Sequence, residues 1–271
     1  MVVPADAARN APRTEAVEDL VPVDQAPAVD YSSMSAEQIR ESLSEQFPDV
    51  DFMVDNWSQV PLRNFAEQWQ TLNRDFDFLL SDFRPRVVGD LDKVFGQKMS
   101  PKMGGGVPST RVDVVDGVRS VVVDVPDGVM RLGVRRSWLD PKTSKVVQAK
   151  ARGELASDNI SSVVSHEFGH LVGFQSKAGA AARNPGMNPN TAILKELSDV
   201  TEQFPSRYPV IGDSWTTLRG KARNELSTYS ASNVDELLAE AFAEVVGSPT
   251  PRPFAQAIYD LMVGLAKEVT T

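Results

Sequence analysis

The sequence His166-Glu167-Phe168-Gly169-His170 contains both histidines of the 271-residue chain. Random placement of two histidines and the glutamates of this composition produces such a pattern in about one chain in 2,500. In a helix, residues four positions apart lie on the same face, so both imidazoles can point at one atom. An ordinary helix that carries two histidines is the alternative, and the low chance frequency argues against it.

This pattern has a specific chemical use. Zinc binds neutral imidazole at about 2.0–2.1 Å in a tetrahedral arrangement, and a catalytic zinc site keeps one position for water. Glu167 follows the first histidine, and its carboxylate can take a proton from that water and pass it to a leaving amine. The motif therefore predicts metal-assisted hydrolysis of an amide bond.

The composition excludes several other classes of protein. The absence of cysteine rules out disulfide frameworks, iron–sulfur clusters, cysteine-ligated zinc and a cysteine nucleophile. The net charge of −9 argues against nucleic-acid binding, because neutralising phosphates requires clustered lysine and arginine. No apolar run approaches the ~20 residues that cross a bilayer, so no membrane partner is expected.

The third ligand of a catalytic zinc must come from an oxygen donor, because the sequence has no cysteine and no third histidine. Ser176 stands where the metzincin pattern requires a histidine, which excludes that subclass. One candidate is Glu196, 26 positions after His170 (196 − 170). The other is Glu236, 66 positions after His170 (236 − 170), in a segment predicted to be a helix.

Glu236 begins a row of three glutamates at helical spacing, with Glu240 and Glu244. Ala239 lies beside this row and would allow another helix to approach closely. The row can equally be a solvated acidic stripe, and Glu236 can serve as the N3 residue of a helix that Asn233 caps. Spacing alone does not decide between Glu196 and Glu236.

The chain divides into an arm and one domain. Residues 1–34 are rich in proline, alanine and acidic residues, with too little apolar surface to offset the entropy of ordering, so we expect a flexible arm. Residues 35–271 form the domain.

Periodicity and capping signals predict one strand, Val50–Val54, and several helices in this domain. The helices are Ala36–Gln46, Pro61–Phe83, one from Ser157 or Asp158 to Phe174, Thr191–Phe204, Asn233–Val246 and Phe254–Val269.

The middle of the chain predicts a small sheet. Three valine-rich runs joined by Asp-Gly turns indicate an antiparallel meander over Val112–Val115, Val118–Val125 and Val129–Val134. Gly104–Gly106 lacks the features of a phosphate-binding loop and is expected to be a connector, as is the stretch 175–190. The fold class is α+β: a small antiparallel or mixed sheet packed on the histidine helix, followed by a helical C-terminal part.

The histidine motif and the segment Tyr229–Phe242 together resemble a known family. The sequence is similar to the zincin-like, gluzincin-type catalytic domain of anthrax toxin lethal factor, and to zincin-like domains of some phage head proteins and bacterial toxins. In that family a tyrosine precedes an asparagine by four positions and the zinc-binding glutamate by seven, and a second glutamate follows four later. Tyr229, Asn233, Glu236 and Glu240 keep these offsets.

The resemblance implies a role for each matching residue. His166, His170 and Glu236 are expected to bind Zn²⁺, with Glu167 as general base. Tyr229 is expected to donate its hydroxyl to the developing oxyanion. Glu240 is expected to orient a ligand histidine.

Two functions from different classes follow. The first is a zinc-dependent endopeptidase whose protein or peptide substrate binds in an extended conformation along an edge strand, for which Val129–Val134 is the candidate. The second is a non-catalytic, zinc-stapled structural or interaction module of a phage virion or toxin system, which contacts a virion partner through the N-terminal arm. The first residues lack the layout of a signal peptide, so we expect a bacterial cytoplasm or a phage virion as the location.

Overall fold

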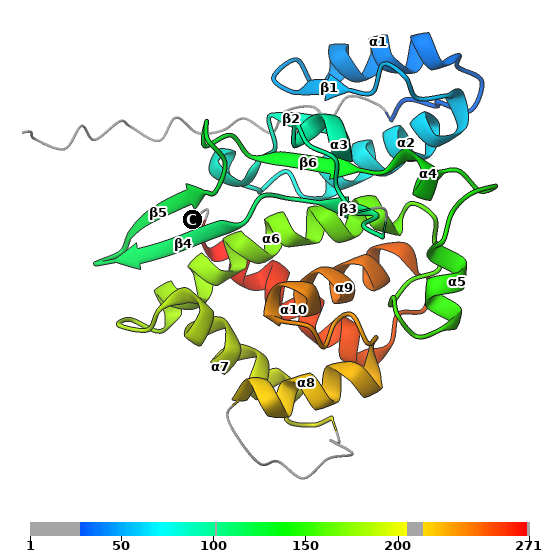
Figure 1. Cartoon of the computed structure of the whole chain (residues 1–271). Coiled ribbons are helices and arrows are strands. Elements are labelled where there is room, and N and C mark those ends of the chain that lie inside the picture. Colours follow the sequence, from blue (N-terminus) through cyan, green and yellow to red (C-terminus); the bar gives the residue numbers. More distant parts are fainter. Residues whose placement is uncertain (1–27, 101, 205–213, 270–271) are drawn as a thin grey trace, which may run out of the picture.

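The computed structural model describes residues 28–100, 102–204 and 214–269, and in these ranges the chain is a mixed α+β protein with two small sheets (Figure 1). The helices are α1 (Ala36–Gln46), α2 (Gln59–Asp75), the 3₁₀ helix η1 (Ser81–Phe83), α3 (Leu91–Val94), α4 (Arg136–Leu139), α5 (Val146–Ala151), α6 (Ser162–Arg183), α7 (Pro189–Thr201), α8 (Ser214–Glu225), α9 (Val234–Gly247) and α10 (Pro253–Glu268). The strands are β1 (Asp51–Met53), β2 (Val87–Asp90), β3 (Gly105–Gly106), β4 (Thr110–Val115), β5 (Val118–Val123) and β6 (Arg131–Val134).

The larger sheet has the order β1-β2-β6-β3. The first three strands are parallel, and β3 pairs antiparallel with β6, with Gly105 opposite Val134 and Gly106 opposite Gly133. The strands β4 and β5 form a separate hairpin. Its turn residues, Asp116 and Gly117, both have positive φ, as the Asp-Gly signal predicts.

The predicted three-stranded meander is wrong in its third strand. β6 does not pair with β5 but lies between β2 and β3 in the larger sheet. Leu132, Gly133 and Val134 are all buried, and because successive residues face opposite sides of a sheet, both faces of this strand are covered, which is typical of an interior strand. Val129–Val134 is therefore not an edge strand, and the edge beside the histidine helix is β3. The glycine run 104–106, which we expected to be a connector, contributes that strand.

α6 is the central helix. Figure 1 shows it crossing the middle of the molecule, with the larger sheet on one side and α7 to α10 on the other. Every residue from Ser162 to Ala181 is buried, so this part of the helix is enclosed on all sides. Phe168 packs against α9 through Phe242, with ring centroids 6.2 Å apart.

α6 differs from its predicted bounds at both ends. It begins after Ser161 rather than Ser157 or Asp158, and it continues to Arg183 rather than ending at Phe174. The polar and small residues after Phe174 are helical because they fit against neighbours. Gln175 donates from Nε2 to the carbonyl of Ala266 at 2.7 Å and accepts from the backbone N–H of Leu80 at 2.8 Å.

α2 also ends earlier than predicted, at Asp75 rather than Phe83. The chain turns there, and the ring of Phe76 lies 4.8 Å from that of Phe242 and 5.9 Å from that of Phe168. Tertiary packing thus uses Phe76 outside the helix, which the helical spacing of apolar residues does not reveal. The other predicted elements are confirmed to within a few residues: Ala36–Gln46, Val50–Val54, Thr191–Phe204, Asn233–Val246 and Phe254–Val269.

Residues 1–27 of the predicted arm lie outside the described residues. Tyr31 is only 1% exposed, and its hydroxyl accepts a hydrogen bond from Gln46 Nε2 at 2.8 Å, so packing begins before residue 35. No helix among the described residues has the length and apolar character needed to cross a membrane.

Gly179 offers a test of the packing of α6. A Cβ atom at Gly179 would lie 2.1 Å from the backbone oxygen of Leu265 on α10. We expect Gly179→Ala to destabilise the protein by about 3 kcal/mol or more, because backbone cannot yield as a side chain does. Gly264→Ala is the matched control, since nothing lies within 4 Å of its Cβ. Thermal unfolding that shows equal midpoints for the two variants would contradict this packing.

Candidate metal centre

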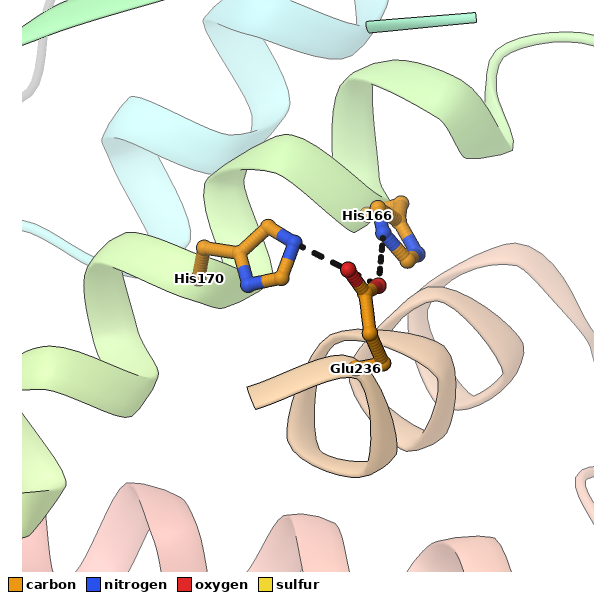
Figure 2. Close-up of side chains that lie close together, drawn as sticks. All are labelled: His166, His170 and Glu236. Atoms are coloured by element: carbon orange, nitrogen blue, oxygen red, sulfur yellow. Dashed lines mark ion pairs between the residues drawn. The ribbon is translucent and has the colours of Figure 1, made fainter. Parts of the chain in front are cut away.

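Two helices bring three predicted ligands together. His166 and His170 lie one turn apart on α6, and Glu236 lies in the first turn of α9. One donor atom from each residue falls within 4.8 Å of the other two. Glu236 Oε2 is 3.1 Å from His166 Nε2 and 3.7 Å from His170 Nε2. Figure 2 shows the Glu236 carboxylate pointing at both imidazoles.

The approach of α9 to α6 depends on small residues at the contact. A Cβ atom at Gly169 would lie 3.1 Å from the Cα of Ala239 and 3.0 Å from the Cβ of Phe242. Glycine between the two histidines therefore lets α9 come close enough for Glu236 to reach them. Asn233 caps α9 by accepting a hydrogen bond from the backbone N–H of Glu236 at 3.0 Å, as predicted, which fixes where the helix starts.

Glu240 orients His166. Its Oε1 is 3.0 Å from His166 Nδ1, which donates the hydrogen bond. Its Oε2 accepts from the backbone N–H of Ala156 at 2.6 Å and from the hydroxyl of Ser227 at 2.9 Å. The glutamate is 2% exposed, so its position is fixed by these partners. Ala156 and Ser227 were not expected from the sequence, because a backbone donor and a lone serine carry no recognisable spacing.

The geometry of the three ligands calls for a positive charge between them. When the His166 ring is neutral, Nδ1 carries the proton that Glu240 accepts, so Nε2 presents a lone pair to Glu236. Glu236 Oε2 is buried without a hydrogen-bond partner. Three electron-rich atoms thus face one another, and only a proton or a cation relieves their repulsion.

The pKa values of the histidines reflect the same arrangement. Burial opposes a charge on His166, but the adjacent carboxylates of Glu236 and Glu240 raise its pKa well above the ordinary value. Burial and the neighbouring His166 lower the pKa of His170 to about 4, so that ring is neutral. A metal ion can take the place of the Nε2 proton of the charged His166 ring, while the Nδ1 proton stays hydrogen-bonded to Glu240, and so satisfy all three ligands at once.

The distances from Glu236 to the two histidines are close to those around a tetrahedral ion. Bonds of about 2.0–2.1 Å place tetrahedral donor atoms roughly 3.4 Å apart, close to the 3.1 and 3.7 Å measured from Glu236 to the two histidines. Among the residues that the structure describes, this is the one group of three or more histidines or acidic residues able to hold a metal ion.

Glu167 lies between the ligands and the edge strand β3. It is 5% exposed, and a Cβ atom at Gly105 would be 2.6 Å from its Oε1. Burial, reinforced by Glu236 and Glu240, raises the pKa of Glu167 to about 8, although His166 opposes the shift. A cation on the ligands would favour the ionised form of this carboxyl.

Tyr229 comes from the loop before α9. Its hydroxyl donates to Glu236 Oε1 at 3.2 Å, and its ring stacks on His166 with centroids 5.7 Å apart. Burial and the charge of Glu236 raise the pKa of Tyr229, so the hydroxyl keeps its proton. The loop is held by backbone hydrogen bonds from Thr228 to Gly153 and from Tyr229 to Glu154, of 2.8 and 3.3 Å.

A cleft of about 450 Å³ opens beside these residues. His166, Glu167 and Tyr229 contribute to its lining. Most of the remaining lining surface is apolar, from Met103, Gly104, Gly105, Trp138, Val146, Ala149, Leu155, Val163 and Ala243. Polar residues complete the lining: Lys102, Glu154, Ser157, Ser162, Thr228, Ser232 and Glu240. The cleft can therefore receive an apolar group next to the candidate metal centre.

The alternative ligand Glu196 is not at this centre. On α7, its carboxylate accepts from Asn184 Nδ2 at 2.7 Å and from Arg183 Nη1 at 3.4 Å. The glutamate row on α9 is not a solvated stripe either. Glu240 and Glu244 are buried, and Glu244 pairs with Arg252.

Comparisons of the chain with protein-family models, with curated proteins and with solved structures give no match.

The choice between Glu236 and Glu196 can be measured. We expect Glu236→Ala to weaken zinc binding by at least tenfold, because it removes one of three ligands, whereas Glu196→Ala leaves it unchanged. Competition with a chromophoric chelator measures the zinc affinity of both variants, which carry the same glutamate-to-alanine change at different positions. Loss of affinity in Glu196→Ala alone would move the site to α7.

Proposed function

We propose that this protein is a zinc-dependent endopeptidase with a zincin-like arrangement of its catalytic residues. The observation that carries the proposal is the convergence of His166, His170 and Glu236, with the carboxyl of Glu167 beside them. The position of the histidine helix beneath an edge strand, with the third ligand on a later helix, supports it as well.

The donor set favours zinc. Two imidazoles and one carboxylate are a ligand set of catalytic zinc sites, and thiolate ligands that would favour other soft-metal chemistry are absent from the sequence. A bound zinc ion supplies Lewis acidity, which polarises a carbonyl group and acidifies water. Glu240 holds His166 in the tautomer that leaves Nε2 free to bind it.

Glu167 acts as the general base in this proposal. Its carboxylate accepts a proton from the attacking water and then delivers it to the nitrogen of the leaving amine. The confined position between β3 and the ligands keeps the carboxyl close to both groups.

Tyr229 stabilises the negative charge that develops on the substrate carbonyl oxygen. Its hydroxyl stays protonated and already points at Glu236, one of the ligands. A hydrogen-bond donor in such a position contributes about 3–4 kcal/mol to transition-state stabilisation.

The substrate is an extended peptide segment. In the described part of the chain, β3 pairs only with β6, so its other edge has backbone groups that can pair with a peptide strand. The apolar cleft next to Glu167 accommodates a large apolar side chain of that peptide. The substrate class is thus a protein segment with an apolar residue adjoining the scissile bond.

The alternative of a zinc-stapled structural module is less well supported. Structural zinc sites are closed by four protein ligands. The candidate group has three within the described residues, and the cleft adjoins it, which favours an open coordination position.

Glu167→Gln tests the catalytic role. We expect it to abolish cleavage of a peptide library while leaving zinc content and affinity unchanged, because an amide cannot accept the proton and Glu167 is not a ligand. Full activity in this variant would exclude Glu167 as the base. Zinc-free wild-type protein with all ligands intact would exclude the function itself.

Gly105→Ala tests the position of Glu167. The added methyl group would overlap the Glu167 carboxyl, so we expect kcat to fall at least tenfold with zinc affinity retained. Gly106→Ala is the matched control on the same strand, because its Cβ would lie 3.4 Å from its nearest neighbour, a side-chain methyl of Leu91. Equal loss of activity in both variants would show that any methyl group on β3 lowers activity, so that displacement of Glu167 does not explain the loss.

A further inference from the structure

A buried lysine lies on the face of α6 that carries the histidines. Lys177 follows His170 by seven positions, two turns along the same face, and is only 6% exposed. It forms an ion pair with Asp235, and its ammonium group lies 5.8 Å from the centre of the Phe174 ring. Lysines are rarely buried unless paired, so this contact needs an explanation.

Asp235 immediately precedes the ligand Glu236 in the first turn of α9. The ion pair thus joins the same two helices as the candidate metal ligands. One turn further along α9, Glu240 contacts Nδ1 of His166. Glu236 is therefore flanked by two contacts between α9 and α6, one with Lys177 and one with His166.

We propose that Lys177 is a positioning residue for the metal centre. Its ion pair with Asp235 holds the first turn of α9 against α6, so that Glu236 reaches the two histidines. It also occupies the Asp235 carboxylate, which keeps that oxygen donor out of the ligand set. This inference rests on the metal site of the proposed function but does not require that the protein hydrolyse peptides.

A positioning role and a simple effect of charge predict opposite changes in metal affinity when Lys177 is removed. If only the electric field mattered, removing the lysine would strengthen the binding of a cation, and removing the aspartate would weaken it. If the pair positions Glu236, removing either partner weakens binding. Removing both then costs no more than removing one, because the same contact is lost.

The experiment measures the zinc affinity of the full chain by competition with a chromophoric chelator. The variants are Lys177→Met, Asp235→Asn and the double variant. Lys195→Met is the matched control, because Lys195 pairs with Asp199 on the exposed face of α7. We expect about tenfold weaker binding in each single variant and in the double variant, and no change in the control. Lys177→Arg keeps the charge and is expected to bind zinc nearly as tightly as wild type.

Several outcomes would overturn the inference. These are tighter binding in Lys177→Met, a hundredfold loss in the double variant, or unchanged affinity with a lower unfolding temperature of the metal-free protein. The double variant leaves no unpaired charge inside the protein, so it tests the contact even if Lys177→Met does not fold. The two effects of charge oppose each other in it, whereas loss of positioning weakens zinc binding. Wild-type protein that binds no zinc would overturn the proposed function. Zinc affinity that is the same in wild type and in all ion-pair variants would overturn this inference alone.

Discussion

α6 and α9 approach so closely that a methyl group on Gly169 would lie only 3.1 Å from the Cα of Ala239 on α9, tighter than an ordinary van der Waals contact. This contact lies between the two histidines in sequence, and the remaining features of the centre depend on it. Glu236 reaches both imidazoles because its helix is near enough, and Glu240 reaches the far nitrogen of His166 for the same reason. Phe168 and Phe242 pack in the same contact and keep water from it.

Close packing of these helices places several ionisable groups inside the protein. His166, Glu167, Glu240 and Lys177 are all less than 9% exposed, and such groups are costly to bury unless their charges are compensated. The structure compensates most of them by pairing: His166 with Glu240, and Lys177 with Asp235. Glu236 Oε2 and Glu167 are the exceptions, and both lie where a metal ion would sit or act.

The sequence predicted the candidate site better than the sheet. His166 and His170 share one face of α6, and Asn233 caps α9, as expected, because helical spacing and capping are local properties set by residues within one or two turns. Spacing alone did not decide between Glu196 and Glu236, because the sequence does not show which of the later helices packs against the histidines. The resemblance in the Tyr229–Glu240 segment, rather than periodicity, favoured Glu236.

Long-range packing explains the errors. The strand Arg131–Val134 pairs with β2, 44 positions earlier in sequence (131 − 87), instead of with its neighbour β5, and no short-range signal records that choice. The α6 segment after Phe174 looks like a loop because its residues are small or polar. These residues let α10 pack closely, since Gly179 lies against the backbone of Leu265 and Gln175 donates to the carbonyl of Ala266. Gly104–Gly106 looked like a connector for the same reason: the glycines make room for Trp138 and Glu167.

The glycine strand has a further consequence for how substrates could be told apart. A strand without side chains offers a peptide hydrogen bonds that are the same for every sequence, so β3 can align a substrate but cannot read it. Discrimination would then fall to the apolar cleft, where Trp138 and Val163 contact whatever side chain enters. In the proposed peptidase, alignment and selectivity would be divided between two separate elements, so a change in cleft residues would redirect the preference for substrate without disturbing the register in which it binds.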